Sequence, residues 1–308
     1  MNKIISIDHG NRMIKTPGVA FPAGYIESSH LPSMDSDVLS YKEKEYSLSD
    51  RLLGQRNDKA SDESYFILTL FAIGKEIFES DDKPEPGEVI DIQLLIGLPP
   101  LHFKAMYKNF ERYFLNRGQV SFWFNKVPFN IKIVGAQAFP QAYAAALTVF
   151  DQIKDYQIVN IIDIGGYTVD CMQLVNHKVN MDVCTSMYSG INLFFQKINE
   201  QVRATGARDI AEITIESILQ NDPKVEGHRH SKMVKEQARI FASSLISHVA
   251  SAGLDLIEDR TVFVGGGSIL FREYLEEDRI ASKPLFVNDP HANAKGYQII
   301  YDKQKAQA

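Results

Sequence analysis

One pattern constrains this chain more than any other: a short, largely apolar stretch that runs into an aspartate, with a glycine two positions later, occurs twice. Residues 4–7 lead into Asp8 at the N-terminus, and residues 159–162 lead into Asp163 near the middle of the chain. Short apolar runs bounded by turn residues predict buried strands. Their recurrence predicts a duplicated α/β unit whose two glycine loops face each other across a cleft.

The residue types at these strand ends suit phosphate and metal chemistry. Glycine lets the backbone turn and present N–H groups to phosphate oxygens, and an aspartate at a strand end can hold a hydrated Mg²⁺ ion. Each loop taken alone is weak evidence, because an Asp-x-Gly sequence also favours an ordinary tight turn.

A third glycine loop follows another apolar stretch. Residues 261–264 predict a buried strand, and Gly265, Gly266, Gly267 and Ser268 come directly after it. Such a loop can lie beneath a ribose and an α-phosphate, where any β-carbon would collide with the ligand. The alternative is a flexible connection between a strand and a helix. The sequence contains neither a Walker-type glycine run ending in Lys-Ser or Lys-Thr nor a dinucleotide-type glycine pattern after the first strand, so P-loop and Rossmann sites have little support.

Length and charge narrow the class of protein. A chain of 308 residues with 44% apolar content is large enough for two cores, so two domains are expected. The formal net charge of −6 disfavours direct DNA binding by the whole chain. The two cysteines form neither a disulfide framework nor a metal cluster, which fits a reducing compartment. We expect a cytoplasmic protein with no membrane partner, because no apolar stretch reaches the length of a signal peptide or a membrane span.

Hydrophobic periodicity predicts the other elements. In chain order they are a hairpin over residues 38–49, a helix over 63–79, a strand over 90–97, a helix over 102–116, a β region ending near 134, an alanine-rich helix over 140–153 and a last helix beginning near Ala292. Residues 155–157 are expected to form a hinge between the domains.

Taken together, the motifs resemble those of a known superfamily. The order Asp8-His9-Gly10, Gln137 before a helix, Asp163-Ile164-Gly165-Gly166 and Gly265-Gly266-Gly267-Ser268 resembles the phosphate, connecting and adenosine motifs of the actin, chaperone and sugar-kinase superfamily. Within it, residues 166–170 and 288–297 are similar to the second phosphate loop and the closing segment of ParM/StbA-type plasmid segregation proteins.

The resemblance implies an α/β protein with the actin-like (RNase H-like) fold, in which two related domains surround a central nucleotide cleft. The implied domains are residues 1–156 with 292–308, and residues 157–291. The implied cofactors are Mg²⁺ and ATP, with GTP as the alternative nucleotide. Asp8 and Asp163 would orient Mg²⁺ through its waters, and Lys15 would reach the β- or γ-phosphate as a point charge. The residues implied to bind the nucleotide are Asp8, Gly10, Asn11, Lys15, Gly165, Gly166, Tyr167, Thr168, Gly265, Gly266, Gly267 and Ser268.

Gln137 and Asp170 are the implied catalytic residues. A glutamine can orient the attacking water but cannot take its proton, so hydrolysis would rest on positioning and electrostatics. The alternative for Asp170 is a capping or turn carboxylate. His9 departs from the acidic or small residue that is usual after the first aspartate, and the sequence does not distinguish a phosphate contact from packing.

The function implied by the resemblance is that of an ATPase that polymerises with Mg-ATP and depolymerises after hydrolysis, thereby driving plasmid DNA segregation. Its implied partners are other copies of itself and a DNA-binding adaptor on a centromere-like site. One alternative is a small-molecule kinase of the same superfamily, and another is a non-hydrolysing scaffold latched by its nucleotide. A DnaK-type chaperone would need a substrate-binding domain that the sequence lacks.

Overall fold

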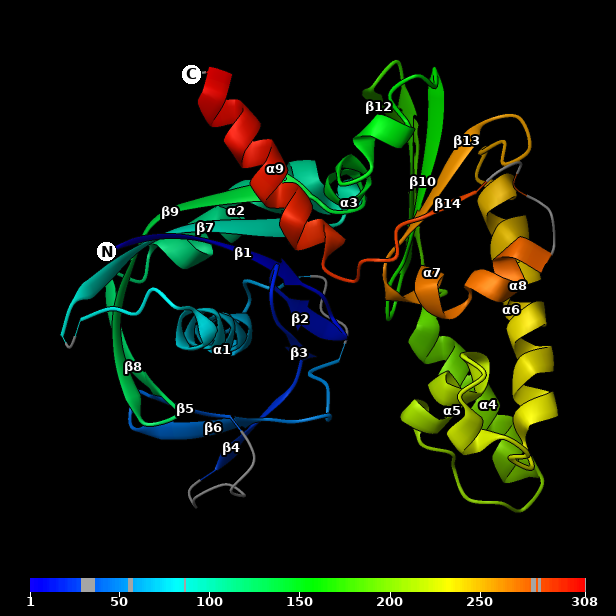
Figure 1. Cartoon of the computed structure of the whole chain (residues 1–308), viewed down its shortest axis with the longest axis horizontal. Helices are drawn as coiled ribbons and strands as arrows, with labels where there is room; N and C mark the ends of the chain where they lie inside the picture. Colours follow the sequence, from blue (N-terminus) through cyan, green and yellow to red (C-terminus); the bar gives the residue numbers. More distant parts are fainter. Residues whose placement is uncertain (29–36, 55–57, 86, 278–280, 282–283, 308) are drawn as a thin grey trace. The chain divides into compact units, whose positions relative to one another are not determined.

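The chain divides into two compact units, which are Met1–Thr148 with His291–Ala308, and Val149–Pro290. The structure, a computed structural model, describes residues 1–28, 37–54, 58–85, 87–277, 281 and 284–307 (Figure 1). The predicted hinge at residues 155–157 falls inside the second unit, after the short 3-10 turn η1 (Phe150–Gln152).

A nine-stranded sheet forms the framework of the first unit. Its strand order is β3-β2-β1-β7-β9-β8-β5-β6-β4. The central strands β1, β7 and β9 run parallel, and their neighbours on both sides are antiparallel. The strands are β1 (Asn2–His9), β2 (Met13–Lys15), β3 (Ala20–Pro22), β4 (Tyr25–Ser28), β5 (Val38–Tyr41), β6 (Lys44–Leu48), β7 (Val89–Leu98), β8 (Gln119–Phe124) and β9 (Val127–Pro140).

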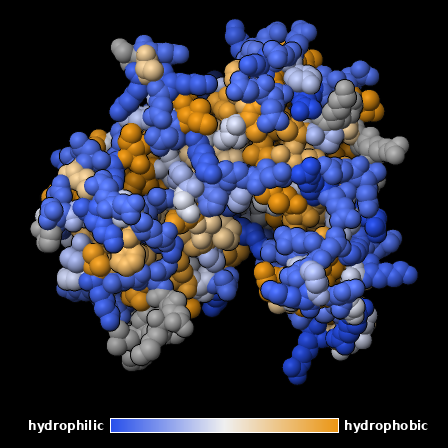
Figure 2. All heavy atoms as spheres, viewed as in Figure 1, coloured by the Kyte–Doolittle hydropathy of each residue, from blue (hydrophilic) through white to orange (hydrophobic). Residues whose placement is uncertain are grey.

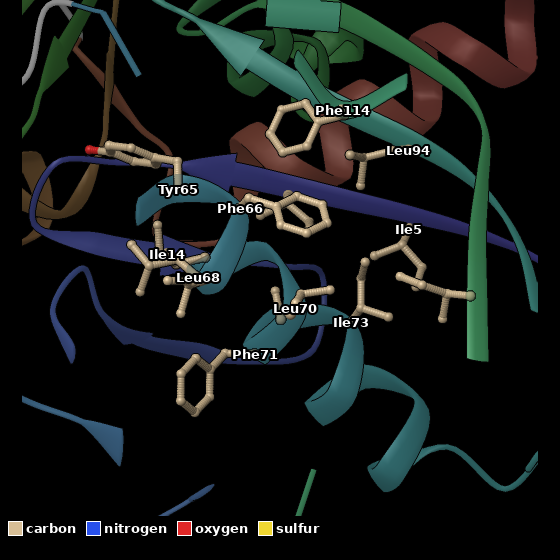
Figure 3. Close-up of a cluster of buried hydrophobic side chains, with 14 of the residues drawn as sticks. Ile5, Ile14, Tyr65, Phe66, Leu68, Leu70, Phe71, Ile73, Leu94 and Phe114 are labelled. Carbon is tan, nitrogen blue, oxygen red and sulfur yellow. The ribbon is translucent and has the colours of Figure 1, made fainter. Parts of the chain in front are cut away.

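Helix α1 (Ser64–Glu79) lies inside the curl of this sheet, between β1 on one side and β5, β6 and β8 on the other (Figure 1). A helix that is apolar around its whole circumference must be buried on all sides. Its side chains, among them Phe66, Leu70 and Phe71, point in different directions into a core shared with Ile5 of β1 and Leu94 of β7 (Figure 3). Helix α2 (Pro100–Leu115) adds Phe110 and Phe114 to the same core.

The opposite face of β1 meets the C-terminal helix α9 (Ala292–Gln307). Successive strand residues point to opposite faces, so Ile5 and Ile7 enter the core around α1, whereas the Ser6 hydroxyl donates to Gln298 on α9. Asp8 shares the face of Ser6. The short helix α3 (Tyr143–Leu147) packs beside α9.

The second unit has a five-stranded sheet with the order β12-β11-β10-β13-β14. The strands are β10 (Ile158–Ile164), β11 (Val169–Val175), β12 (Lys178–Met187), β13 (Arg260–Val264) and β14 (Leu285–Phe286). The helical elements are α4 (Ile191–Ala204), α5 (Glu212–Leu219), η2 (Pro223–Val225), α6 (Ser231–Ser251), α7 (Gly266–Leu270) and α8 (Arg272–Glu277). Apolar side chains of α4, α5, α6 and α8 form one core with Ile162, Ile164 and Phe263 of the sheet.

The two sheets share an arrangement of five strands. In unit 1 the order β3-β2-β1-β7-β9 has two antiparallel pairs followed by two parallel pairs, and β12-β11-β10-β13-β14 has the same sequence of pairings in unit 2. The repeated sequence pattern therefore belongs to β1 and β10, which hold the same position in the two sheets.

Most predicted elements are confirmed, but the alanine-rich helix over residues 140–153 is wrong. Strand β9 continues to Pro140 because it pairs with β7 as far as Leu98, and only Tyr143–Leu147 is α-helical before η1. The hairpin at 38–49 and the helices predicted at 63–79 and 102–116 are confirmed as β5 with β6, as α1 and as α2.

Within the described ranges, no helix combines the length and the apolarity that crossing a membrane requires. Hydrophilic residues cover much of each unit on the face shown in Figure 2, with apolar residues scattered among them.

Candidate functional site

The first candidate loop joins β1 to β2 in an antiparallel hairpin. Asp8 is paired across the strands with Lys15. Cross-strand partners in an antiparallel pair project to the same face of the sheet, so the carboxylate and the half-buried lysine lie on the face that α9 covers. The residues between them include Gly10 and Asn11, and the Asn11 Oδ1 accepts a hydrogen bond of 2.7 Å from the Tyr65 hydroxyl.

Two amides hold the buried carboxylate of Asp8, which is 6% exposed. The Nε2 of Gln141, just beyond β9, donates to Asp8 Oδ1 at 2.6 Å, and the Nδ2 of Asn293 in α9 donates to Oδ2 at 3.4 Å. Hydrogen bonds to a charged group contribute about 1.5–3 kcal/mol when well formed. Asp8 is thus oriented by residues far from it in the sequence.

His9 belongs to the core and not to the ligand surface. Its side chain is fully buried among Tyr65, Phe110 and Phe114. The Thr69 hydroxyl donates to the Tyr65 carbonyl and lies 2.8 Å from His9 Nε2, so Nε2 carries the proton and donates to it. Burial, aided by the nearby ammonium of Lys59, lowers the pKa of His9 to about 3. His9 is therefore a neutral packing residue.

The second candidate loop joins β10 to β11. Asp163 is the direct cross-strand partner of Asp170, and the two side chains are 9% and 8% exposed. The Thr168 hydroxyl donates to Asp170 Oδ2 at 3.1 Å, while the Gly165 N–H donates to the Thr168 carbonyl at 2.9 Å and closes the turn. Like charges directly opposite each other destabilise a sheet, so this pair of carboxylates favours a cation beside it.

The start of α4 holds this loop from behind. The N–H groups of Gly190, Ile191 and Asn192 donate to the carbonyls of the loop residues Tyr167, Gly165 and Gly166 at 2.8–3.1 Å. A β-carbon on Gly190 would lie 2.5 Å from the Gly166 carbonyl oxygen. The loop carbonyls are thereby engaged by α4.

The third candidate loop, Gly265 to Ser268, packs against the second. Gly265 has φ 86° and ψ 162°, and a β-carbon there would lie 2.2 Å from Asp163 Oδ1. A β-carbon on Gly267 would lie 2.3 Å from Ile164 Cγ2, whereas one on Gly266 would meet no described atom within 4 Å. Ser268 is fully buried and its hydroxyl donates to the Gly265 carbonyl at 2.7 Å. Gly265 and Gly267 thus allow close packing against Asp163 and Ile164, whereas a β-carbon on Gly266 would enter open space among the described residues.

Gln137 does not join these groups. It lies within β9, and its Nε2 donates to Gln304 Oε1 on α9 at 2.7 Å. The glutamine that contacts Asp8 is Gln141, which the sequence reasoning missed because it placed residues 140–153 in a helix. The available signal was a second glutamine directly after a proline at the end of an apolar strand.

Each unit by itself carries residue types that suit a nucleotide bound with a divalent cation. Asp8 in unit 1, and Asp163 and Asp170 in unit 2, are hard oxygen donors of the kind that Mg²⁺ prefers, and each is held by buried hydrogen bonds or strand pairing. Among the described residues, no group of three or more histidines, cysteines and carboxylates is arranged to hold a metal ion by itself. Lys15 supplies a positive charge beside Asp8, and the half-buried loop Gly165–Thr168 leaves its outer side accessible.

Comparison with known proteins gives a family match over part of the chain. Residues 161–277 match the family described as archaeal actin homologue MreB-like, C-terminal. No curated protein sequence matches the chain.

Solved structures resemble the whole chain at low sequence identity. The archaeal actin homologue Ta0583 is 16% identical with a TM-score of 0.78, covering 98% of this chain and 99% of its own. The actin-like protein Alp7A is 17% identical with a TM-score of 0.76, covering 100% and 99%. ParM from Clostridium botulinum, in a 15-stranded filament, is 17% identical with a TM-score of 0.74, covering 99% and 100%. Together with the two sheets described above, these similarities show that this chain has the actin-like fold.

Proposed function

We propose that this chain is an ATPase that binds Mg-ATP with the loops described above and polymerises into filaments. The observation that carries the proposal is the matched pair of hairpins: each unit has an aspartate at the end of the same strand and a charged cross-strand partner seven residues later, Lys15 in one and Asp170 in the other. Similar structures support it, since Ta0583 has been solved in complex with ADP and both ParM and Alp12 as filaments.

The proposed roles follow the chemistry of each side chain. Lys15 contacts a terminal phosphate, and the N–H groups and hydroxyls of the loops from Gly10 and from Gly165 bind phosphate oxygens. The loop at Gly266 lies against the nucleoside, where a side chain would obstruct it. Gln137 and Asp170 orient the attacking water, a role that for Gln137 requires its amide to leave Gln304.

Asp8 and Asp163 are proposed to hold Mg²⁺ through its waters. The ion would neutralise charge that develops on the phosphates during transfer. The nucleotide is proposed to be ATP, with GTP as the alternative.

Filament growth with ATP and disassembly after hydrolysis would suit movement of plasmid DNA in the cytoplasm. Head-to-tail contacts between identical subunits are heterologous and produce open helical assemblies. The formal net charge of −6 favours contact with DNA through an adaptor protein on a centromere-like site over direct binding. The proposed domains keep the predicted ranges, residues 1–156 with 292–308 and residues 157–291.

The test follows light scattering and phosphate release together after Mg-ATP is added to the purified chain. We expect scattering to rise and then to decay as phosphate appears, and to persist without phosphate release in Asp170→Ala. Asp182→Ala removes an exposed carboxylate of β12 and should behave as the wild type. Phosphate release without scattering would contradict filament formation and favour a monomeric kinase or ATPase. Scattering without phosphate release in the wild type would favour the non-hydrolysing scaffold.

A further inference from the structure

The carboxylate of Asp8 is held unequally by its two amide donors. The contact from Gln141 Nε2 is short, at 2.6 Å, as expected of a donor to a charged acceptor, whereas the contact from Asn293 Nδ2, at 3.4 Å, is long and weak. Both amides are 9% exposed. Gln141 is therefore the residue that fixes the orientation of Asp8, and Asn293 supports it.

The backbone beside Gln141 is strained. Ala142 has φ 60° and ψ −58°, a γ-turn conformation that is rare for a residue with a side chain. The turn is closed by the hydrogen bond from the Tyr143 N–H to the Gln141 carbonyl, and the Ala142 N–H donates to Asn293 Oδ1 at 3.0 Å. Strain of this kind persists where the surroundings hold it, and it concentrates at functional sites.

These contacts form a closed ring within one unit. Gln141 contacts Asp8, Asp8 contacts Asn293, and Asn293 contacts the residue next to Gln141. The N–H of Gln141 also donates to the Leu98 carbonyl at 2.9 Å, which ties the ring to the end of β7. The strained turn thus directs the Gln141 amide at Asp8.

The ring leaves Asp8 able to accept more hydrogen bonds. An ionised carboxylate has about four acceptor positions, and the two amides occupy one on each oxygen. The direction of the positions that remain depends on how the carboxylate is turned. Carboxylates that serve metal ions are commonly oriented in this way by hydrogen-bonding partners, whose loss costs about 10–100-fold in metal affinity or activity.

We propose that Gln141 is a positioning residue for the nucleotide site: it holds Asp8 in the orientation that directs the remaining acceptor positions at the waters of a bound divalent cation. The inference rests on the proposed function, because it assigns Asp8 to that cation. It adds a residue outside the sequence motifs of the loops, contributed by the turn after β9.

The test measures how much Mg²⁺ the intact chain needs to bind a fluorescent ATP analogue. Gln141→Met keeps most of the side-chain volume but removes the N–H donor, and Gln141→Glu places a second carboxylate beside Asp8. We expect Gln141→Met to raise the Mg²⁺ concentration at half-maximal binding by about tenfold or more, and Gln141→Glu to raise it further.

The matched control is Gln173→Met. Gln173 is 8% exposed and donates to Asn160 Oδ1 at 3.0 Å, so it resembles Gln141 in burial and bonding, but it belongs to unit 2 and its amide contacts asparagines, not a carboxylate. A purely structural role would make both variants lose stability and leave the Mg²⁺ requirement unchanged. We expect only the Gln141 variants to change it.

A second readout uses neither nucleotide nor metal. In EDTA, the urea midpoints of the wild type, Gln141→Met, Asp8→Ala and the double variant form a double-mutant cycle. The shift caused by Gln141→Met should be at least halved when Asp8 is already alanine, because no buried carboxylate is then left without its donor.

The outcomes separate this inference from the proposed function. A wild type that needs Mg²⁺ for nucleotide binding, with Gln141→Met equal to it, would overturn the role of Gln141 alone. If Gln141→Met shifted the urea midpoint equally in the wild type and in Asp8→Ala, the inference that Gln141 orients Asp8 would be wrong. A wild type that binds no Mg-nucleotide would overturn the proposed function together with the role given to Gln141.

Discussion

Lys15 and Asp170 occupy equivalent positions in the two units of this chain. Each is the cross-strand partner of the aspartate at the end of the first strand of its hairpin, Asp8 or Asp163, and each follows that aspartate by seven residues. The two units therefore carry side chains of opposite charge at this equivalent strand position. Under the proposed function, the positive charge of Lys15 attracts phosphate, while Asp170 orients the attacking water.

Replacing Lys15 tests the phosphate side of this difference. Lys15→Gln should raise the Kd for Mg-ATP by about tenfold, which corresponds to about 1.4 kcal/mol of lost attraction. Isothermal titration of the purified chain measures it. Lys44→Gln, which removes an exposed lysine paired with Glu27, is the matched control and should leave the Kd unchanged. An unchanged Kd in Lys15→Gln would remove this lysine from the nucleotide site.

The glycine loop at the end of β13 provides a matched pair of substitutions. Gly265→Ala should lower the free energy of unfolding by about 2 kcal/mol or more, because its backbone lies in a region open almost only to glycine and its β-carbon would meet Asp163. Gly266→Ala should leave the free energy of unfolding within about 0.5 kcal/mol of the wild type, since no described atom lies near its β-carbon.

Nucleotide binding is the second property that these substitutions test. Gly266→Ala is expected to weaken ATP binding although it folds normally, and urea unfolding with fluorescent-nucleotide titration measures both quantities. Normal affinity in Gly266→Ala would show that the nucleoside does not lie against this residue.

His9 should make stability depend on pH. Its pKa in the folded protein is lowered to about 3 from an ordinary value of 6.5, so the unfolded chain binds the proton more readily between these values. The contribution of His9 to the free energy of unfolding is therefore fully present above about pH 6.5 and is lost as the pH drops toward 3. The loss between pH 8 and pH 5 should be about 2 kcal/mol from this group.

Urea unfolding at several pH values checks this expectation. His9→Phe keeps an aromatic ring in the cluster but cannot bind a proton. Between pH 8 and pH 5, its free energy of unfolding should therefore fall by about 2 kcal/mol less than that of the wild type. Parallel pH profiles for the wild type and the variant would contradict a buried neutral histidine.

The two cysteines should react with alkylating reagents at very different rates. Burial, with the charge of Asp170 beside it, raises the pKa of Cys171 to about 12, and its side chain is 1% exposed. Cys184 is half-buried, and burial raises its pKa as well. Because the thiolate is the reactive form, peptide mapping at pH 8 should find Cys184 labelled first and Cys171 labelled only after unfolding. Equal labelling rates in the folded chain would refute the burial of Cys171.

Local patterns were sufficient for much of the fold. The apolar runs before Asp8 and Asp163 predicted β1 and β10, and apolar residues at helical spacing within 63–79 predicted α1, because these elements follow from periodicity within a few residues. The motif order was likewise sufficient to predict the actin-like fold that the structural comparisons confirm.

The failure at residues 140–153 shows where local reasoning ends. Several alanines favour a helix, yet strand pairing of β9 with β7 extends the sheet to Pro140 and a γ-turn at Ala142 follows. The competing interactions come from β7, some forty residues earlier in the sequence. Helix propensity contributes little free energy per residue, so strand pairing in the tertiary structure overrides it.

By itself, the sequence determined which residues end the strands and which loops are rich in glycine, since both follow from neighbouring side chains. The tertiary structure alone decided what surrounds them. It buried His9 among aromatic rings, turned Gln137 toward Gln304 and brought Gln141 and Asn293 onto Asp8 from segments that lie 133 and 285 residues away. Such contacts depend on how sheets and helices pack, and no periodicity along the chain encodes the direction of a single amide.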